Sequence, residues 1–210
     1  MIKALSESGV DTICATPHFY ADRIGVGEFL ERRAESADIV GSLLDKNSPR
    51  ILLGAEVRYY AGISRMEALC ELCIEDTGLL LLEMPFCRWT EYTQRELAEL
   101  AGAAPFGVVL AHIERYMKFQ NKKTWDRLYN EGLYMQVNAD FFSSFSTRRK
   151  AVKMISSDMI HFIGSDCHNM TTRPPDLAGA YNVIEKKLGA QFRQAVDSYG
   201  YSMIKSSRGF

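Results

Sequence analysis

Short, mostly apolar runs alternate with helical patterns along almost the whole chain, and this alternation limits the fold more than any other feature. Runs of this length and continuity are typical of strands that are buried on both faces. We predict six of them, at residues 11–19, 50–60, 79–85, 107–112, 134–138 and 161–163. Helical patterns occur at residues 4–9, 26–45, 62–75, 90–101, 121–131, 147–156, 176–188 and 191–199. Strands and helices in this order predict a parallel α/β fold.

The 210 residues have an ordinary globular composition, with 47% hydrophobic and 24% charged residues. We find no linker-like or low-complexity segment, so we expect residues 1–210 to form a single domain. The helical pattern at residues 4–9 resembles the tail of a helix that should follow a strand. We therefore expect the chain to be N-terminally truncated and to lack the first strand of its fold.

Charge and cysteine content exclude several classes of protein. Twenty-five basic and 26 acidic residues give a net charge of −1, so there is no electrostatic case for binding nucleic acid or an anionic membrane. No apolar run is long enough to span a membrane, and Met1 begins no recognisable signal peptide. The spacing of the five cysteines is not that of a disulfide framework, so we expect the protein to reside in a reducing cytoplasm. Cys70 and Cys73 form a C-x-x-C in a helical pattern, where packing on a helix face is the better interpretation.

Five of the six predicted strands end in residues that can bind a metal ion. In a β/α barrel such strand exits converge at one end, where the chemistry takes place. Glu83 is the most informative, because a carboxylate directly after four leucines is costly to bury unless it is paired or bound to metal. His161 stands at a strand start, the wrong end for chemistry, and we leave it out. The candidate metal ligands are His18, Glu56, Glu83, His112, Asp166 and His168.

Asp166 and His168 stand two residues apart after the strand that ends at Gly164. If the extended geometry continues past Gly164, both side chains lie on one face, and Cys167 points to the other. A carboxylate beside an imidazole can hold a divalent ion or carry out acid/base chemistry.

The ligand types and two arginines indicate the reaction. His, Asp and Glu without Cys suit Mn²⁺, Fe or Zn²⁺, and bridging carboxylates suit more than one ion. Arg115 and Arg173 supply planar forks for phosphate oxygens. Metal ions that activate water, together with arginines that hold the developing charge, predict phosphoester hydrolysis.

Cys167 and Arg173 also have the C-x5-R spacing of cysteine-dependent phosphatases. Such a loop must wrap its backbone N–H groups round a phosphate, which favours glycines, and residues 168–172 contain none. Asp166 beside the thiol disfavours the thiolate. We interpret the spacing as a coincidence.

Six motifs, in order, carry a family resemblance. They are Ala15-Thr16-Pro17-His18, Gly54-Ala55-Glu56-Val57, Leu82-Glu83-Met84-Pro85, Ala111-His112-Ile113-Glu114-Arg115-Tyr116, Gln136-Val137-Asn138-Ala139 and Gly164-Ser165-Asp166-Cys167-His168. Together they resemble the PHP (polymerase and histidinol phosphatase) superfamily. Within it they are most similar to the bacterial manganese-dependent tyrosine-protein phosphatases of capsule and exopolysaccharide gene clusters. The resemblance covers about residues 9–180, and the His112–Tyr116 stretch and Arg173-Pro174-Pro175 are its more specific parts.

The resemblance implies a distorted, TIM-like (β/α)7 barrel with two to three Mn²⁺ ions. The implied substrate is phosphotyrosine on a cognate bacterial tyrosine kinase that regulates polysaccharide synthesis and export. The six candidate ligands fall on the family's metal-ligand positions. Arg115 and Arg173 fall on its phosphate-binding or catalytic positions, and we also expect a catalytic role for His168.

One departure from the family pattern leaves alternatives open. The family opens with a strand that carries His-x-His, followed by an Asp in the next loop, and nothing in this chain matches that strand. We therefore expect fewer bound ions and weak or absent activity. The alternatives are another PHP phosphoesterase, similar to histidinol phosphatase, and a non-catalytic relative that binds a phosphopeptide or a kinase.

Overall fold

The computed structural model describes residues 1–206, which fold around a curled sheet whose strand pairs are all parallel. β1 pairs with β3. β2 pairs with β4, and β5, β6, β7 and β8 follow β4 side by side in the order of the sequence. The predicted parallel α/β fold is confirmed. The strands are β1 (Thr12–Ala15), β2 (His18–Phe19), β3 (Arg50–Leu53), β4 (Glu56–Arg58), β5 (Leu79–Glu83), β6 (Gly107–Leu110), β7 (Tyr134–Asn138) and β8 (Phe162–Gly164).

Two of the predicted strands, at residues 11–19 and 50–60, are each broken into two. The breaks lie opposite one another, and the backbone stays paired across them: Gly54 N donates to Ala15 O at 2.9 Å and Glu56 N to Pro17 O at 3.0 Å. Pro17 has no N–H to continue the ladder on its own strand. A Cβ at Gly54 would lie 2.7 Å from Cγ1 of Ile74, so only a glycine at this position lets the segment around Ile74 come this close.

Eight α-helices accompany the described strands, and two of them begin at side-chain caps. Thr90 accepts from Thr93 N at 3.1 Å, and Asn121 accepts from Thr124 N at 3.0 Å. The helices are α1 (Ile2–Glu7), α2 (Val26–Gly41), α3 (Glu91–Ala103), α4 (Lys122–Asn130), α5 (Asp140–Ser143), α6 (Arg148–Ile155), α7 (Ala178–Leu188) and α8 (Ala190–Ser206).

The prediction of a helix at residues 62–75 is wrong. This segment forms two 3-10 turns, η1 (Ile63–Arg65) and η2 (Glu67–Leu72). Gly62 is left-handed with φ of 93°, and Met66 between the turns is extended with ψ of 107°, so no continuous helix can propagate. Ile63, Met66, Leu69 and Cys73 nevertheless pack in or against the core, and their spacing of three and four residues explains the helix-like apolar pattern.

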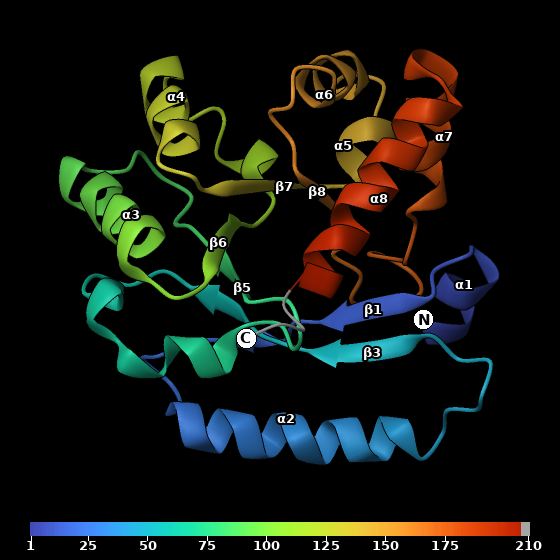
Figure 1. Ribbon diagram of the computed structural model, residues 1–210, viewed down its shortest axis with the longest axis horizontal. Helices are drawn as coiled ribbons and strands as arrows, with labels where there is room; N and C mark the ends of the chain where they lie inside the picture. The colour runs from blue at the N-terminus through green and yellow to red at the C-terminus, as the bar shows by residue number, and fades with distance from the viewer. Residues whose placement is uncertain (207–210) are drawn as a thin grey trace.

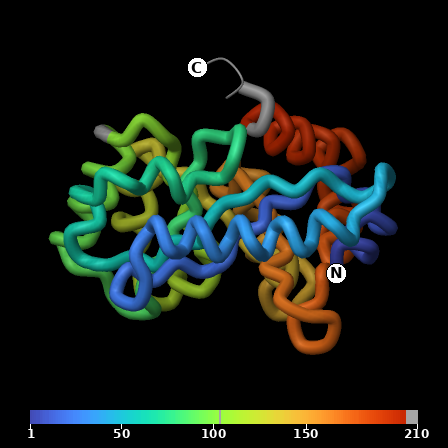
Figure 2. Tube along the Cα trace, turned by 90° about the horizontal axis from the view of Figure 1, so that it is seen from below, coloured from blue at the N-terminus to red at the C-terminus, as the bar shows by residue number. Residues whose placement is uncertain are grey.

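The helices lie outside the curled sheet (Figure 1). Helix α2 runs beneath β1 and β3, α3 stands beside β6, α4 lies near the start of β7, and α5 to α8 gather near β7 and β8. Figure 2, which views the molecule from below, shows α2 crossing in front of the first strands. Phe29 of α2 meets Phe19 of β2 edge-on at 5.2 Å between ring centroids, which fixes this helix against the sheet.

Within residues 1–206, β1 pairs only with β3 and β8 only with β7, so the sheet is an open half-barrel with two free edges. The carboxyl ends of β2, β4, β5, β6, β7 and β8 face the same way because all their pairings are parallel. None of the described helices is long and apolar enough to cross a membrane.

Candidate metal and phosphate site

Four of the predicted ligands meet at one end of the sheet: His18 and Glu56 open β2 and β4, Glu83 ends β5, and His112 follows β6. His18 pairs in register with Glu56, and its Nδ1 lies 3.7 Å from Glu56 Oε1. His112 Nε2 lies 3.0 Å from Glu56 Oε1 and 3.7 Å from Glu83 Oε1. One ligand atom from each of His18, Glu56 and Glu83 lies within 4.8 Å of the others, which is the spacing of groups around a common ion.

The polar groups of this cluster are buried without enough partners of their own. Glu56 is 7% exposed and His112 is 2% exposed. His18 Nδ1 is buried and has no hydrogen-bond partner within the described part of the chain. Two carboxylates and a lone imidazole nitrogen that converge in a buried place are costly unless a cation joins them. The donor set of nitrogen and carboxylate oxygen therefore fits a divalent metal ion.

His112 is held in place by Tyr116. The Tyr116 hydroxyl lies 3.1 Å from His112 Nδ1 and also accepts from Met84 N at 2.9 Å. With Nδ1 protonated and donating to the phenol, the Nε2 lone pair points at the two carboxylates, an orientation typical of metal-bound histidines. Burial raises the pKa of Tyr116, so the phenol stays neutral. His112 itself is left-handed, with φ of 34°, and lies beyond the end of β6 rather than inside the predicted strand.

The second half of the site is built round Asp166, which follows β8. Arg115 Nη2 donates to Asp166 Oδ2 at 2.6 Å, Asn138 Nδ2 donates to the same oxygen at 2.9 Å, and Arg173 Nη2 also contacts it. Burial on its own raises the pKa of the Asp166 carboxyl, but Arg115 and Arg173, with the hydrogen bonds from Arg173 and Asn138, outweigh it and lower that pKa overall. Asp166 is therefore an ionised carboxylate between two guanidinium groups.

The expectation that extended geometry continues past Gly164 is wrong, because Asp166 is left-handed with φ of 49°. His168 still lies at the site: its Nδ1 is 3.7 Å from Asp166 Oδ1, and its Nε2 is 3.0 Å from Nη1 of Arg173. A turn, not an alternating strand, brings the two side chains together. Asn and Asp tolerate this conformation better than most residues, which is consistent with Asp at this position.

Backbone N–H groups of the loop from His168 to Arg173 are hydrogen-bonded within the loop itself. His168 N donates to Arg173 O at 3.0 Å, and the Asn169 side chain accepts from the N–H groups of Thr171, Thr172 and Arg173 at 2.9, 2.7 and 3.2 Å. A thiol phosphatase needs these groups free to cradle a phosphate. The geometry thus agrees with the interpretation of the C-x5-R spacing as a coincidence.

A buried amide joins the two halves of the site. Gln136 Oε1 accepts from His112 N at 2.5 Å, and Gln136 Nε2 donates to Asn138 Oδ1 at 3.1 Å. Asn138 in turn donates to Asp166, and the rings of His18 and His168 lie 5.8 Å apart. The structure thus gathers all six candidate ligands, with Arg115 and Arg173, at one end of the sheet.

Sequence reasoning gave no role to several residues of this network. Gln136 lies inside β7, where a polar residue carries no signal of its own. Asn138 at the end of β7 and Tyr116 four residues after His112 could have been found from their positions at strand exits. Glu114 also belongs to this network, because its Oε2 accepts from Asn138 N at 3.4 Å. Burial raises the pKa of the Glu114 carboxyl to about 7.

An exposed aromatic ring borders the metal half of the site, which consists of His18, Glu56, Glu83 and His112. Phe86, three residues after Glu83, is 51% exposed. Its ring stacks over His112 at 6.2 Å with an interplanar angle of 15° and lies 5.4 Å from Tyr116. Trp89 packs against Tyr116 from within the core. The mouth of the site therefore has one apolar, aromatic wall.

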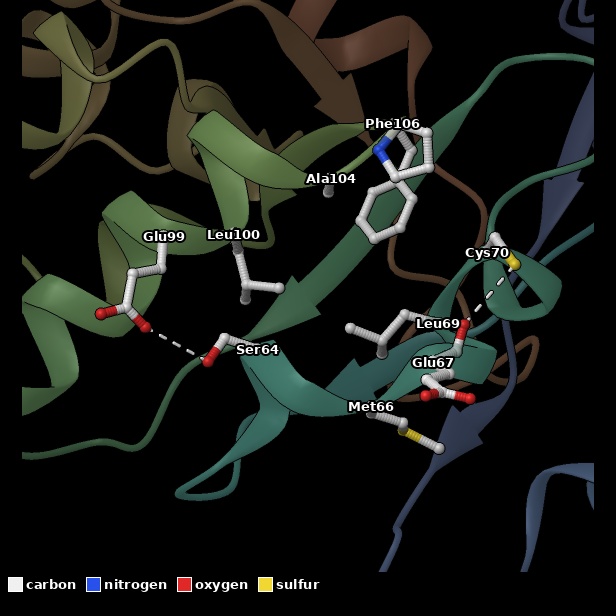
Figure 3. A pocket seen from close by; sticks show the side chains of 10 residues that line it. Ser64, Met66, Glu67, Leu69, Cys70, Glu99, Leu100, Ala104 and Phe106 are labelled. Atoms are coloured by element: carbon white, nitrogen blue, oxygen red, sulfur yellow. Dashed lines mark hydrogen bonds between the residues drawn. The ribbon is translucent and has the colours of Figure 1, made fainter.

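Two other features lie away from this end. His161 precedes β8, and its Nδ1 accepts from Met135 N at 2.9 Å, a structural role at the amino end of the strand. A cavity of about 210 Å³ opens between η2 and α3 (Figure 3). None of the candidate site residues lines it: the lining consists of Ser64, Met66, Glu67, Leu69, Cys70, Glu99, Leu100, Ala104, Pro105 and Phe106.

The chain is similar in sequence to curated tyrosine-protein phosphatases. The Tyrosine-protein phosphatase CpsB of Streptococcus pneumoniae is 30% identical over 201 residues, which cover 87% of this chain and 79% of that protein. The Putative tyrosine-protein phosphatase CapC of Staphylococcus aureus is 30% identical over 217 residues, covering 95% of this chain and 78% of that protein.

A solved structure shares the fold. It comes from work on YwqE from Bacillus subtilis and CpsB from Streptococcus pneumoniae, which are described there as unique metal-dependent tyrosine phosphatases. It matches with a TM-score of 0.82 at 22% identity and covers 98% of this chain and 85% of the other.

The family model for capsular polysaccharide synthesis, CpsB/CapC, matches residues 1–200. This is the capsule-cluster family that the sequence motifs indicated, and that prediction is confirmed. The chain belongs to the CpsB/CapC family of capsular polysaccharide synthesis.

Proposed function

We propose that this protein is a metal-dependent tyrosine-protein phosphatase of capsular polysaccharide synthesis. The observation that carries the proposal is the meeting of the His18–Glu56–Glu83–His112 cluster with the Arg115–Asp166–Arg173 group at one end of the sheet. Metal ligands beside guanidinium groups are what hydrolysis of a phosphate monoester requires. Its relatives carry the name of tyrosine-protein phosphatase.

The residues fall into distinct roles. His18, Glu56, Glu83 and His112 would hold one metal ion, and Asp166 and His168 would contribute ligands to a second. The bound metal supplies positive charge and lowers the pKa of water at the site. Arg115 and Arg173 side chains are 35% and 37% exposed, so their forks remain reachable for phosphate oxygens.

His168 has a further, catalytic role in this proposal. Its Nε2 lies beside Arg173 and its ring is 39% exposed at the opening of the site. Nε2 accepts from Arg173 in this geometry, so we infer that the imidazole turns away from Arg173 when it donates a proton to the phenolic oxygen that leaves. The Phe86 wall over His112 suits a substrate whose phosphate is attached to an aromatic ring.

Several finer points belong to the same proposal. We infer Mn²⁺ as the metal, because nitrogen and carboxylate ligands suit it, with fewer ions than the two to three that the family resemblance implies. The substrate is phosphotyrosine on the tyrosine kinase of the same polysaccharide system, which places the protein in the cytoplasm. The free edges at β1 and β8 are what a distorted (β/α)7 barrel short of one strand presents. Residues 1–210 act as one domain.

The experiment compares two substrates and two metal states. Protein purified in Mn²⁺ is assayed with a phosphotyrosine peptide and with histidinol phosphate, before and after a chelator, and its metal content is measured. We expect the peptide to be preferred and the activity to fall with the metal content. Preference for histidinol phosphate would favour the other PHP phosphoesterase, and metal binding without turnover of either substrate would favour the non-catalytic relative.

A further inference from the structure

Two arginines are fixed on one aromatic ring at the edge of the site. The Tyr20 ring stacks on His18, with centroids 5.5 Å apart and an interplanar angle of 28°. Arg23 Cζ lies 4.7 Å and Arg58 Cζ lies 5.6 Å from the centre of the same ring. Arg58 is the last residue of β4 and pairs in register with Glu83. The ring therefore holds both guanidinium groups beside the metal half.

Neither arginine is neutralised. Arg23 and Arg58 are exposed, and within residues 1–206 no ion pair within 4.0 Å joins either of them to a carboxylate. Arg32 and Arg193, by contrast, are paired with Glu28 and Glu185. A guanidinium that rests on an aromatic face keeps its donors free and loses little further freedom on binding.

The site also opens on this side. The His18 side chain is 34% exposed, whereas that of His112 is 2% exposed. A phosphate that reaches Arg115 and the metal cluster past His18 leaves the residues next to the phosphotyrosine close to Tyr20, whose ring stacks on His18. Carboxylates in those residues would meet two unpaired guanidinium groups.

We propose that Tyr20, Arg23 and Arg58 form a basic rim that binds acidic residues next to the phosphotyrosine of the substrate protein. This inference rests on the proposed function and adds a substrate class to it: phosphotyrosine segments rich in Asp or Glu. The arginines act on binding, not on the phosphate chemistry. Their contribution weakens with salt because they are exposed.

The test uses a matched pair of peptides with a non-hydrolysable phosphonate in place of phosphotyrosine. One peptide carries Asp and Glu on both sides of that residue, and the other carries Asn and Gln. Binding to the Mn²⁺-loaded protein is measured by fluorescence anisotropy at low and high salt. The variants are R23A, R58A and R23A/R58A. The control is R95A, because Arg95 lies over the Tyr92 ring at 5.6 Å on helix α3, in the same kind of contact but away from the candidate site residues.

We expect the parent and R95A to bind the acidic peptide about 3–10-fold more tightly, as for two exposed charge pairs. The preference should shrink in each single variant, disappear in R23A/R58A and fade at high salt. Equal binding of both peptides by the parent, or a preference that survives in R23A/R58A, overturns the inference. If R23A/R58A does not fold, the inference is tested by whether the preference for the acidic peptide shrinks in R23A and in R58A. A parent that prefers the acidic peptide but hydrolyses no phosphotyrosine would refute the proposed function and leave the basic rim standing.

Discussion

His112 Nε2 lies 3.0 Å from Glu56 Oε1, although 56 positions separate the two residues in the chain. Both side chains are buried, and β5 lies between the strands that carry them. The parallel order β4–β5–β6 makes this contact possible, because it places Glu56, the first residue of β4, near the loop that His112 begins after β6. The contact joins a buried carboxylate to an imidazole whose other nitrogen is bonded to Tyr116, and it marks the centre of the proposed metal site.

Glu56→Gln keeps the shape of this side chain but removes its charge. We expect the variant to lose metal affinity by at least about 10–100-fold, the effect of disturbing even an outer-shell partner of a metal ligand. Metal analysis after dialysis and hydrolysis of a phosphotyrosine peptide measure the loss. Glu91→Gln is the control, because the Glu91 side chain is 90% exposed on α3. Full metal occupancy in Glu56→Gln would remove this residue from the ligand set.

Arg115→Ala separates phosphate binding from metal binding. Arg115 contacts Asp166 but none of His18, Glu56, Glu83 and His112, so we expect the ion that those four residues hold to stay bound. Turnover should fall by about 10²–10³, as when a donor that stabilises developing charge is removed. Arg127→Ala on α4 is the control, because Arg127 pairs with Glu91 and Glu131 on the outer surface. Near-parental activity in Arg115→Ala would contradict the role assigned to Arg115.

The sequence predicted the site residues better than the backbone that carries them. Glu56 and Glu83 could be found because a carboxylate at the end of an apolar strand is conspicuous, whatever the surrounding turns do. His112 and Asp166 were placed in extended segments, yet both adopt positive φ. Such turns depend on tertiary contacts, such as the bond from His112 N to Gln136, that no local pattern contains.

The same limit explains the error at residues 62–75. Ile63, Met66, Leu69 and Cys73 pack in or against the core at spacings of three and four, which an α-helix would also produce. The segment instead follows the core surface in short turns, and Glu96 of α3 holds its start by accepting from Gly62 N at 2.6 Å. A contact from a helix 34 positions away decides the conformation, so the local pattern cannot.

His161 predicts a dependence of stability on pH. Burial lowers the pKa of its imidazole, with Asp158 opposing in part. The unfolded chain thus binds a proton more readily than the folded chain, so this contribution to stability is present above about pH 6.5 and is lost as the pH falls through the lowered pKa. Protonation also removes the acceptor for Met135 N.

Urea unfolding in a chelator, at about pH 8 and about pH 5, measures this effect. The variant His161→Asn keeps a short acceptor but does not titrate in this range. We expect its free energy of unfolding to fall less between the two pH values than that of the parent. Equal falls in the two proteins would show that His161 is not the titrating group.

Phe86→Ala tests the aromatic wall over His112. We expect KM for an aryl phosphate to rise about 2–10-fold, the range of one aromatic contact, with a smaller change in kcat. An alkyl phosphate, which has no ring to stack, should lose less. Phe86→Tyr preserves the ring and serves as the control. Equal losses for aryl and alkyl phosphates would mean that Phe86 acts only by packing on His112 and Tyr116.

Gly164→Ala tests whether the two halves of the site are joined through Gln136. A Cβ at Gly164 would lie 2.5 Å from Gln136 Nε2, the atom that donates to Asn138. This amide is buried and bonded at both ends, so it cannot move aside without freeing His112 N or Asn138. Each buried polar group left unsatisfied costs about 1–3 kcal/mol.

We therefore expect Gly164→Ala to lower both the free energy of unfolding and the phosphatase activity. Gly102→Ala is the matched control, because Gly102 lies in helix α3 and no described atom lies within 4 Å of its added Cβ. Alanine should stabilise that helix by up to about 1 kcal/mol. A second variant, Gln136→Ala, makes room for the Cβ that Gly164→Ala adds, so the losses of the two variants should not add. Additive losses in the double variant would show that Gly164 and Gln136 act separately, and that the halves communicate by another route.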